Sequence, residues 1–139
     1  WFESLVLMFQ KEVADRIIAE SNTSKYGRLS ILSNWKLDIK KIMDIKPLSF
    51  SPRPKVDSTL LVLTPKKNFF YLKDAKNLEM ITRVFFSQRR KMLKKPFNQV
   101  FKNAKQVAEK FNIDLNLRPQ NLEPEIYFKL AKECEFLGS

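Results

Sequence analysis

The hydrophobic pattern of this chain changes near residue 65, and this change limits the folds that the chain can adopt. Before residue 65, apolar residues gather in short runs, over residues 5–9 and 60–63, whose length suits buried β-strands. From Asp74 onward, apolar residues recur at the spacing of amphipathic helices. The sequence therefore predicts an α/β chain, with a strand-containing unit over residues 1–65 followed by a basic helical unit over residues 66–139.

The first unit is expected to contain three strands and at least one helix. The strands are predicted over residues 5–9, 39–45 and 59–64. Residues 11–20 carry Val13, Ile17 and Ile18 at helical spacing, which predicts a helix. Residues 28–36 fit a helix in their apolar spacing and a strand in their length, so both alternatives stay open at this point.

The longest helix is predicted over residues 75–93, with Asp74 as its N-cap. Pro96 ends or restarts this helix, because proline has no backbone N–H to donate. The buried side of the helix is predicted to carry four apolar residues, namely Leu78, Ile81, Phe85 and Met92. The opposite side is predicted to carry Arg83, Arg90 and Lys94. Shorter helices are expected over residues 97–101, 105–112 and 124–136.

Positive charge is concentrated in the second unit. The chain has a net charge of +11, and residues 66–139 hold 16 Lys and Arg against 8 Asp and Glu. No acidic residue occurs from residue 80 to residue 108, a stretch that contains Arg83, Arg89, Arg90, Lys91, Lys94, Lys95, Lys102 and Lys105. Ordinary protein surfaces mix charges of both signs. The stretch therefore favours binding to nucleic-acid phosphates, with a solvated helix face as the alternative.

Several residue types are rare or absent, and their absence excludes classes of site. The chain has no histidine and one cysteine, Cys134, so an internal disulfide and a cysteine-based zinc cluster are excluded, and Cys134 is expected to be a structural thiol. Gly27 and Gly138 are its only glycines, which excludes a glycine-rich phosphate loop. The absence of histidine also removes the commonest metal ligand, so no metal is expected. No apolar run is long enough to cross a bilayer and no signal peptide is visible, so no membrane partner is expected.

A proline-rich segment over residues 50–58 reads Phe-Ser-Pro-Arg-Pro-Lys-Val-Asp-Ser. Its two prolines predict a stiff loop in extended geometry, with Phe50 at its entrance and Arg53 and Lys55 projecting from it. An aromatic side chain beside fixed positive charge suits a nucleotide base and its phosphates. The alternatives are that Phe50 belongs to the core and that Lys55 and Asp57 only flank a strand.

Two carboxylates, Glu12 and Asp15, share one side of the helix expected over residues 11–20. They permit a paired acid–base site. The i,i+4 spacing of Glu12 and Arg16 instead favours an ordinary ion pair along the helix.

Four stretches of the chain resemble the rRNA adenine N6,N6-dimethyltransferase family, the bacterial type that modifies small-subunit rRNA. They cover residues 6–16 (VLMFQKEVADR), 26–30 (YGRLS), 50–58 (FSPRPKVDS) and 86–91 (FSQRRK). Their order and spacing match the family over nearly the whole chain. The proline-rich element and the Gln-Arg-Arg-Lys element are the specific signals.

The resemblance implies a fold and a function. Residues 5–10, 39–45 and 59–64 would be the last three strands of a Rossmann-like methyltransferase sheet, residues 28–36 the helix between them, and the rest a small all-helical C-terminal domain. The family uses S-adenosylmethionine and stacks an aromatic side chain on the target adenine, a role that falls to Phe50. RNA binding would fall to Arg53, Lys55, Arg89, Arg90, Lys91, Lys94 and Lys95. The expected partner is small-subunit rRNA or its precursor particle, in the cytoplasm.

The family's cofactor loop, its acidic residue for the cofactor ribose and its Asn-Leu-Pro-Tyr motif do not occur in this sequence. We therefore expect a C-terminal portion that alone neither binds S-adenosylmethionine nor methylates. The strand over residues 5–9 would then expose an edge and an apolar face, so either self-association or a rearranged strand region is expected. The alternative function is a non-catalytic RNA-binding or ribosome-assembly module.

Overall fold

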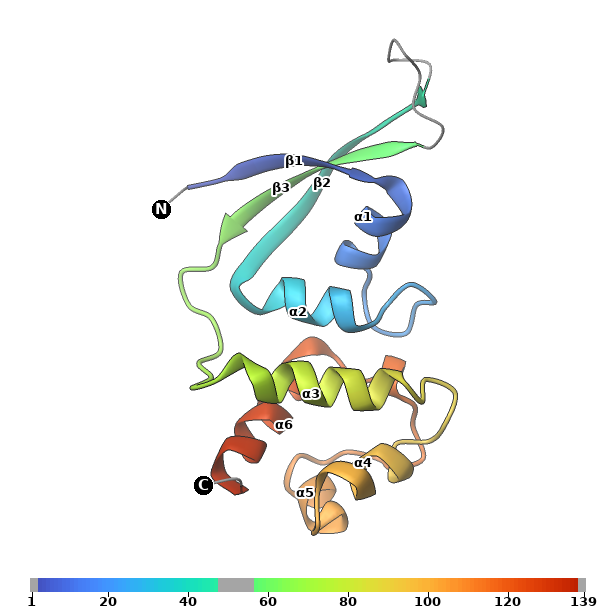
Figure 1. The fold of residues 1–139 in the computed structure, drawn as a ribbon, viewed down its shortest axis with the longest axis vertical. Coiled ribbons are helices and arrows are strands. Elements are labelled where there is room, and N and C mark those ends of the chain that lie inside the picture. The colour runs from blue at the N-terminus through green and yellow to red at the C-terminus, as the bar shows by residue number, and fades with distance from the viewer. Residues whose placement is uncertain (1–2, 48–56, 138–139) are drawn as a thin grey trace.

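A computed structural model describes residues 3–47 and 57–137, and it contains one small sheet and two layers of helices (Figure 1). The sheet has the order β1-β3-β2, formed by β1 (Leu5–Gln10), β2 (Leu37–Ile45) and β3 (Ser58–Pro65). The central strand β3 runs antiparallel to both neighbours, with Leu61 opposite Leu7 and Leu63 opposite Ile39. The three predicted strands are thus confirmed, in a sheet that leaves β1 at one edge.

Two helices cover one side of the sheet and connect it to the rest of the chain, namely α1 (Lys11–Ile18) and α2 (Arg28–Lys36). The open alternative over residues 28–36 is resolved as a helix, as the resemblance implied. The backbone N–H of Gly27 donates to Ser30 Oγ at 3.2 Å where α2 begins. In α1, Arg16 pairs with Glu12 at 3.0 Å, so the ion-pair alternative is confirmed there.

The second half of the chain is helical, as predicted. It contains α3 (Ala75–Phe86), α4 (Lys94–Val100), α5 (Ala104–Lys110), the 3₁₀ helix η2 (Pro119–Asn121) and α6 (Pro124–Leu137). Asp74 is the N-cap of α3, because its carboxylate accepts the backbone N–H of Lys76 at 2.9 Å. The buried side of α3 carries Leu78, Ile81 and Phe85, which are fully inaccessible to solvent.

The predicted extent of α3 is wrong, because the helix ends at Phe86 and not at residue 93. A series of turns follows, and the backbone N–H of Leu93 donates to Leu117 O at 2.8 Å in place of a helical partner. Leu93 is fully buried, whereas Met92 is 50% exposed. A continuous helix would give these two neighbours the opposite arrangement. Burial of Leu93 and the backbone hydrogen bond from Leu93 to Leu117 therefore outweigh the local helical pattern.

This shorter helix changes where the predicted cations lie. Arg83 belongs to α3, Arg90 to the turns that follow, and Lys94 begins α4, so they do not share one helical face. Pro96 lies in the first turn of α4, where its missing N–H leaves no helical hydrogen bond unmade.

One hydrophobic core joins the two predicted units. Tyr26 and Ile31, from the strand-containing half, lie in the same buried cluster as Phe85 and Tyr127 from the helical half. Figure 1 shows α2 between the sheet and α3, and α2 also contacts α6. The helix α2 therefore packs against both the sheet and the helices of the second half.

The sheet itself is poorly covered along β1. The side chains of Leu5, Val6, Leu7 and Met8 are 39–53% exposed. The strand keeps its regular pairing with β3, so in this structure the edge and its apolar residues are exposed without rearrangement of the sheet. Among the residues that the structure describes, no helix is both long and apolar enough to cross a membrane.

Candidate nucleic-acid interface

The predicted site residues of the proline-rich segment, Phe50, Arg53 and Lys55, lie outside the described residues. The structure does describe the strands on either side of that segment, where Ile45 of β2 pairs with Ser58 of β3. The end of β1 is adjacent, because the backbone N–H of Lys11 donates to Asp57 O at 2.9 Å. Two chain segments that are distant in sequence thus meet beside the start of β3.

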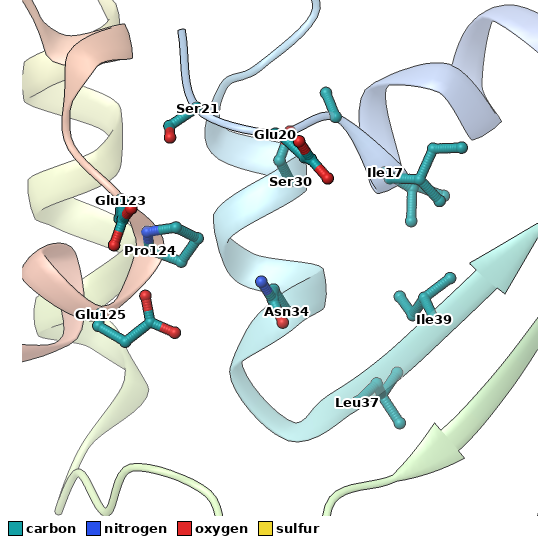
Figure 2. A pocket seen from close by; sticks show the side chains of 12 residues that line it. Ile17, Glu20, Ser21, Ser30, Asn34, Leu37, Ile39, Glu123, Pro124 and Glu125 are labelled. Atoms are coloured by element: carbon teal, nitrogen blue, oxygen red, sulfur yellow. The ribbon is translucent and has the colours of Figure 1, made fainter. Parts of the chain in front are cut away.

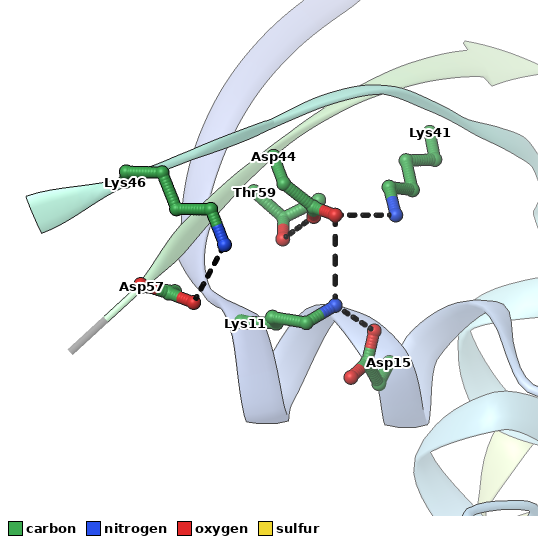
Figure 3. A network of polar contacts seen from close by, with 7 residues as sticks. All are labelled: Lys11, Asp15, Lys41, Asp44, Lys46, Asp57 and Thr59. Carbon is green, nitrogen blue, oxygen red and sulfur yellow. Dashed lines mark hydrogen bonds and ion pairs between the residues drawn. The ribbon is translucent and has the colours of Figure 1, made fainter. Parts of the chain in front are cut away.

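A network of charged side chains lies at this end of the sheet (Figure 3). Asp44 accepts hydrogen bonds from Lys41 and from Thr59, both at 2.8 Å, and lies 3.6 Å from Lys11 Nζ. The hydrogen bonds from Lys41 and Thr59 lower the pKa of Asp44 to about 2. Asp44 is therefore a carboxylate at neutral pH, and it connects β2, β3 and α1. Sequence reasoning missed Asp44, because its contact with Thr59 is set by the pairing of β2 with β3.

Most cations of the Gln-Arg-Arg-Lys element and its surroundings face solvent. Arg90, Lys91, Lys94 and Lys95 are all exposed, in the turns after α3 and the first turn of α4. The turns are held from outside by Arg118, whose Nε donates to Arg90 O at 3.1 Å. Exposed cations on a fixed backbone can bind phosphates without first breaking other contacts.

Arg89 has a different environment from its neighbours. Its guanidinium donates to three backbone carbonyls, those of Tyr26, Thr23 and Ser24, with the last at 2.8 Å. It also lies over the ring of Phe86, 5.9 Å from the centroid. Arg89 was predicted to bind RNA phosphates, and the structure places it where it holds the loop before α2 against the end of α3.

Replacing Arg89 with alanine is expected to lower the free energy of unfolding by about 2 kcal/mol, since hydrogen bonds from a charged donor contribute more than neutral ones. The exposed neighbour Arg90 gives the matched control, and Arg90→Ala is expected to change stability by less than about 0.5 kcal/mol. Urea unfolding followed by circular dichroism measures both. Equal stabilities for the two variants would contradict the structural role of Arg89.

A separate cavity of about 460 Å³ lies between the end of α1, α2, β2 and the start of α6 (Figure 2). Its walls include the carboxylates of Glu20, Glu123 and Glu125. Negative charge there repels phosphates, so this cavity is not a candidate for nucleic-acid binding. Among the described residues, no group of three or more His, Cys, Asp or Glu is arranged to hold a metal ion.

Two other titratable side chains, those of Tyr26 and Cys134, have pKa values that burial raises. Burial, with smaller contributions from Glu125 and Glu123, raises the pKa of Tyr26 well above its ordinary value, and its hydroxyl donates to Leu122 O at 2.7 Å. Burial and then Glu133 raise the pKa of Cys134 to about 11. Cys134 is thus protonated at neutral pH, as a structural thiol should be.

The family model for ribosomal RNA adenine dimethylase matches residues 2–135 of the chain. The chain belongs to this family. The matched residues include all four sequence stretches, so the resemblance that they indicated is confirmed.

Curated relatives are similar along the full length of the chain. Over 137 residues, 99% of the chain, it is 80% identical to ribosomal RNA small subunit methyltransferase A of Pelagibacter ubique (strain HTCC1062). It is 42% identical over the same length to the methyltransferase of that name from Wolbachia sp. subsp. Drosophila simulans (strain wRi). These matches cover 52% and 50% of the two relatives, so the chain spans about half the length of the curated relatives it matches.

Solved structures confirm the α/β fold. The crystal structure of a dimethyladenosine transferase from Plasmodium falciparum matches 99% of the chain and 58% of its own, with a TM-score of 0.79 and 28% identity. The crystal structure of the 23S rRNA methyltransferase ErmE matches 96% of the chain and 55% of its own, with a TM-score of 0.63. At 17% identity, the second match shows a shared fold alone.

Proposed function

We propose that this chain is the RNA-facing portion of an S-adenosylmethionine-dependent enzyme that dimethylates adenines of small-subunit rRNA. The observation that carries the proposal is the 80% identity to ribosomal RNA small subunit methyltransferase A over 99% of the chain. The match spans 99% of the chain, so it includes the proline-rich segment and the basic turns, the two regions where substrate contacts are expected. In the whole enzyme, S-adenosylmethionine supplies the methyl group that the adenine amine takes up.

RNA binding by this chain rests on the exposed cations Arg90, Lys91, Lys94 and Lys95. They come from one turn region and one helix start, and that region is fixed by buried Leu93 and by Arg118. Their expected contacts are phosphates, which position the RNA without reading its sequence. Arg53 and Lys55 of the proline-rich segment would add contacts nearer the target base.

The proposal that this chain binds RNA but does not bind the cofactor can be tested by calorimetry. We expect titration with a single-stranded RNA to show binding whose affinity falls steeply as the salt concentration rises. We expect titration with S-adenosylmethionine to show no binding, because the family's cofactor motifs do not occur in this sequence. Stoichiometric binding of S-adenosylmethionine would contradict the proposed role, and failure to bind any RNA would remove it.

Phe50 is proposed to stack on the target adenine after that base leaves the RNA helix. In a whole enzyme that also carries the cofactor-binding half, Phe50→Ala is expected to reduce turnover by about tenfold to a hundredfold. This loss is the equivalent of one lost base–aromatic stack. RNA affinity should change little, since most of it comes from phosphates. Methyl transfer from labelled S-adenosylmethionine and RNA-binding anisotropy measure the two effects.

The control is Phe69→Ala, the same substitution at an aromatic residue that is 42% exposed. It should leave turnover unchanged. If Phe50→Ala instead lowers turnover only in proportion to a loss of folded protein, Phe50 is a core residue.

A further inference from the structure

The pairing of β2 with β3 is irregular at one point, beside the network of charged side chains in Figure 3. Lys41 lies opposite Leu61 and Asp44 lies opposite Thr59, so β2 advances three residues where β3 advances two. The pairing passes over Ile42, which forms a β-bulge. Opposite residues of an antiparallel pair point to the same side, and residues two apart in a strand share a face. The bulge therefore places Lys41 and Asp44 on one face of the sheet, together with Thr59.

The bulge decides which side chain meets Thr59. In a regular strand, Met43 would lie opposite Thr59 and Asp44 would point to the other face. Thr59 is fully buried, so an apolar neighbour would remove the carboxylate that its hydroxyl now reaches at 2.8 Å. Bulges disrupt regular pairing and commonly occur next to active sites, where they redirect a side chain. Here the bulge directs the carboxylate of Asp44 towards a buried hydroxyl, and Met43 is left 51% exposed.

Asp44 joins three elements at this end of the sheet. Besides the Thr59 hydroxyl of β3, it contacts Lys11, whose Nζ lies 3.6 Å from its carboxylate. Lys11 begins α1, where its Nζ lies 3.5 Å from Asp15, and its backbone N–H donates to Asp57 O at 2.9 Å. The Asp44 side chain is 34% exposed, and ion pairs with this much exposure add little to stability. The network therefore contributes more to the placement of the strand ends than to the stability of the fold.

These contacts lie where the proline-rich segment is attached to the sheet. Ile45 pairs with Ser58, and between these two residues the chain leaves the sheet and returns to it. Asp44 comes directly before this pair on β2, and Thr59 comes directly after it on β3. Their hydrogen bond therefore fixes the two attachment points relative to each other, and Lys11 fixes them relative to the end of β1.

We propose that Asp44 is a positioning residue for adenine methylation, because it fixes the two attachment points of the proline-rich segment. The proposal rests on the proposed function, since Asp44 affects the reaction through the place that Phe50 takes beside the adenine. RNA would still bind through its phosphates if these points moved, so RNA affinity depends little on Asp44. The rate depends strongly on it, because a displacement of about 1 Å at the reacting groups costs up to about a hundredfold in rate.

The test is steady-state methyl transfer to small-subunit rRNA by a whole enzyme that carries this chain together with the cofactor-binding half. Asp44→Asn keeps the shape of the side chain and an oxygen for the Thr59 hydroxyl, but it removes the charge that holds Lys11. We expect kcat to fall about tenfold, while KM for RNA and for S-adenosylmethionine stays within about twofold. The midpoint of urea unfolding should move by less than about 0.5 M, because the lost ion pairs are exposed.

The matched control is Asp38→Asn, the same substitution at an exposed carboxylate of β2. Asp38 lies opposite Thr64, at the other end of the strand and on the other face of the sheet. This variant should keep the kcat of the unmodified enzyme. An equal fall in kcat for Asp38→Asn and Asp44→Asn would contradict a specific role for Asp44.

The link from Asp44 to β3 is tested separately at Thr59. Thr59→Val keeps the shape but removes the hydroxyl, and it is expected to lower kcat about fivefold, whereas Thr59→Ser restores kcat to within about twofold. Residues that act as a unit have effects that do not add. The double variant Asp44→Asn/Thr59→Val should therefore be no slower than the slower single variant.

The outcomes separate this proposal from the proposed function. If the unmodified whole enzyme methylates the rRNA and Asp44→Asn keeps its kcat, the positioning role is wrong and the proposed function stands. A fall in activity that only follows a loss of folded protein, or a raised KM with unchanged kcat, also overturns the positioning role. If the unmodified whole enzyme leaves the adenines unmethylated, both proposals fail.

Discussion

Replacing Tyr26 with alanine is expected to lower the free energy of unfolding by about 3–5 kcal/mol, the usual cost of removing a large buried aromatic ring. Tyr26 is fully buried, its ring meets Phe86 edge to face at 6.1 Å, and its hydroxyl donates to Leu122 O. These contacts connect the loop before α2 to α3 and to the segment before α6. Their loss should therefore weaken the sheet-containing half and the helical half together.

Urea unfolding followed by both tryptophan fluorescence and circular dichroism measures this effect. Trp35 in α2 donates to Phe70 O at 2.6 Å, so its fluorescence reports on the junction. Both signals should give one shared transition in the unmodified chain and in Tyr26→Ala. Tyr71→Ala, at a tyrosine that is 65% exposed, is the matched control and should cost under about 1 kcal/mol. Two separate transitions, with only one shifted by Tyr26→Ala, would show that the halves fold independently.

Reversing the charge of Arg90 and Lys91 together is expected to weaken RNA binding by roughly a hundredfold at low salt, since two phosphate contacts become repulsions. The salt dependence of log affinity should fall by about 1.4 for a single strand, corresponding to two lost contacts. Stability should hardly change, because both side chains are exposed. Anisotropy with labelled RNA and urea unfolding of Arg90→Glu/Lys91→Glu measure the two quantities.

The control for this variant reverses two exposed lysines elsewhere, Lys40 on β2 and Lys129 on α6. It changes the net charge by the same amount, so it isolates local contacts from overall attraction to RNA. Equal losses for both double variants would mean that RNA senses only the total charge. Unchanged affinity for Arg90→Glu/Lys91→Glu would remove the turns after α3 from the interface.

The strands and most helices follow from local sequence pattern, whereas the end of α3 does not. Met92 continues the apolar spacing of Leu78, Ile81 and Phe85, so the sequence predicts one long helix. The structure buries Leu93 instead, through a backbone pairing with Leu117 that is 24 residues away along the chain. Only the tertiary arrangement decides between these neighbours, and local periodicity carries no information about it.

The candidate site shows the same limit. A run of cations predicts RNA binding for Arg89, Arg90 and Lys91 alike, because the sequence does not show which guanidinium meets the loop carbonyls. Arg89 lies 63 residues from its partner Tyr26.

The central claim is that this chain can serve as the RNA-facing half of a small-subunit rRNA dimethyltransferase. It is tested most directly by a chimera in which the chain replaces the matching 137 residues of the Pelagibacter ubique methyltransferase. The chimera is expressed in bacteria that lack their own dimethyltransferase, and N6,N6-dimethyladenosine in small-subunit rRNA is measured by mass spectrometry. We predict that the chimera restores the dimethylated adenines. A folded chimera that leaves them unmethylated, while the unmodified relative restores them, would contradict the claim.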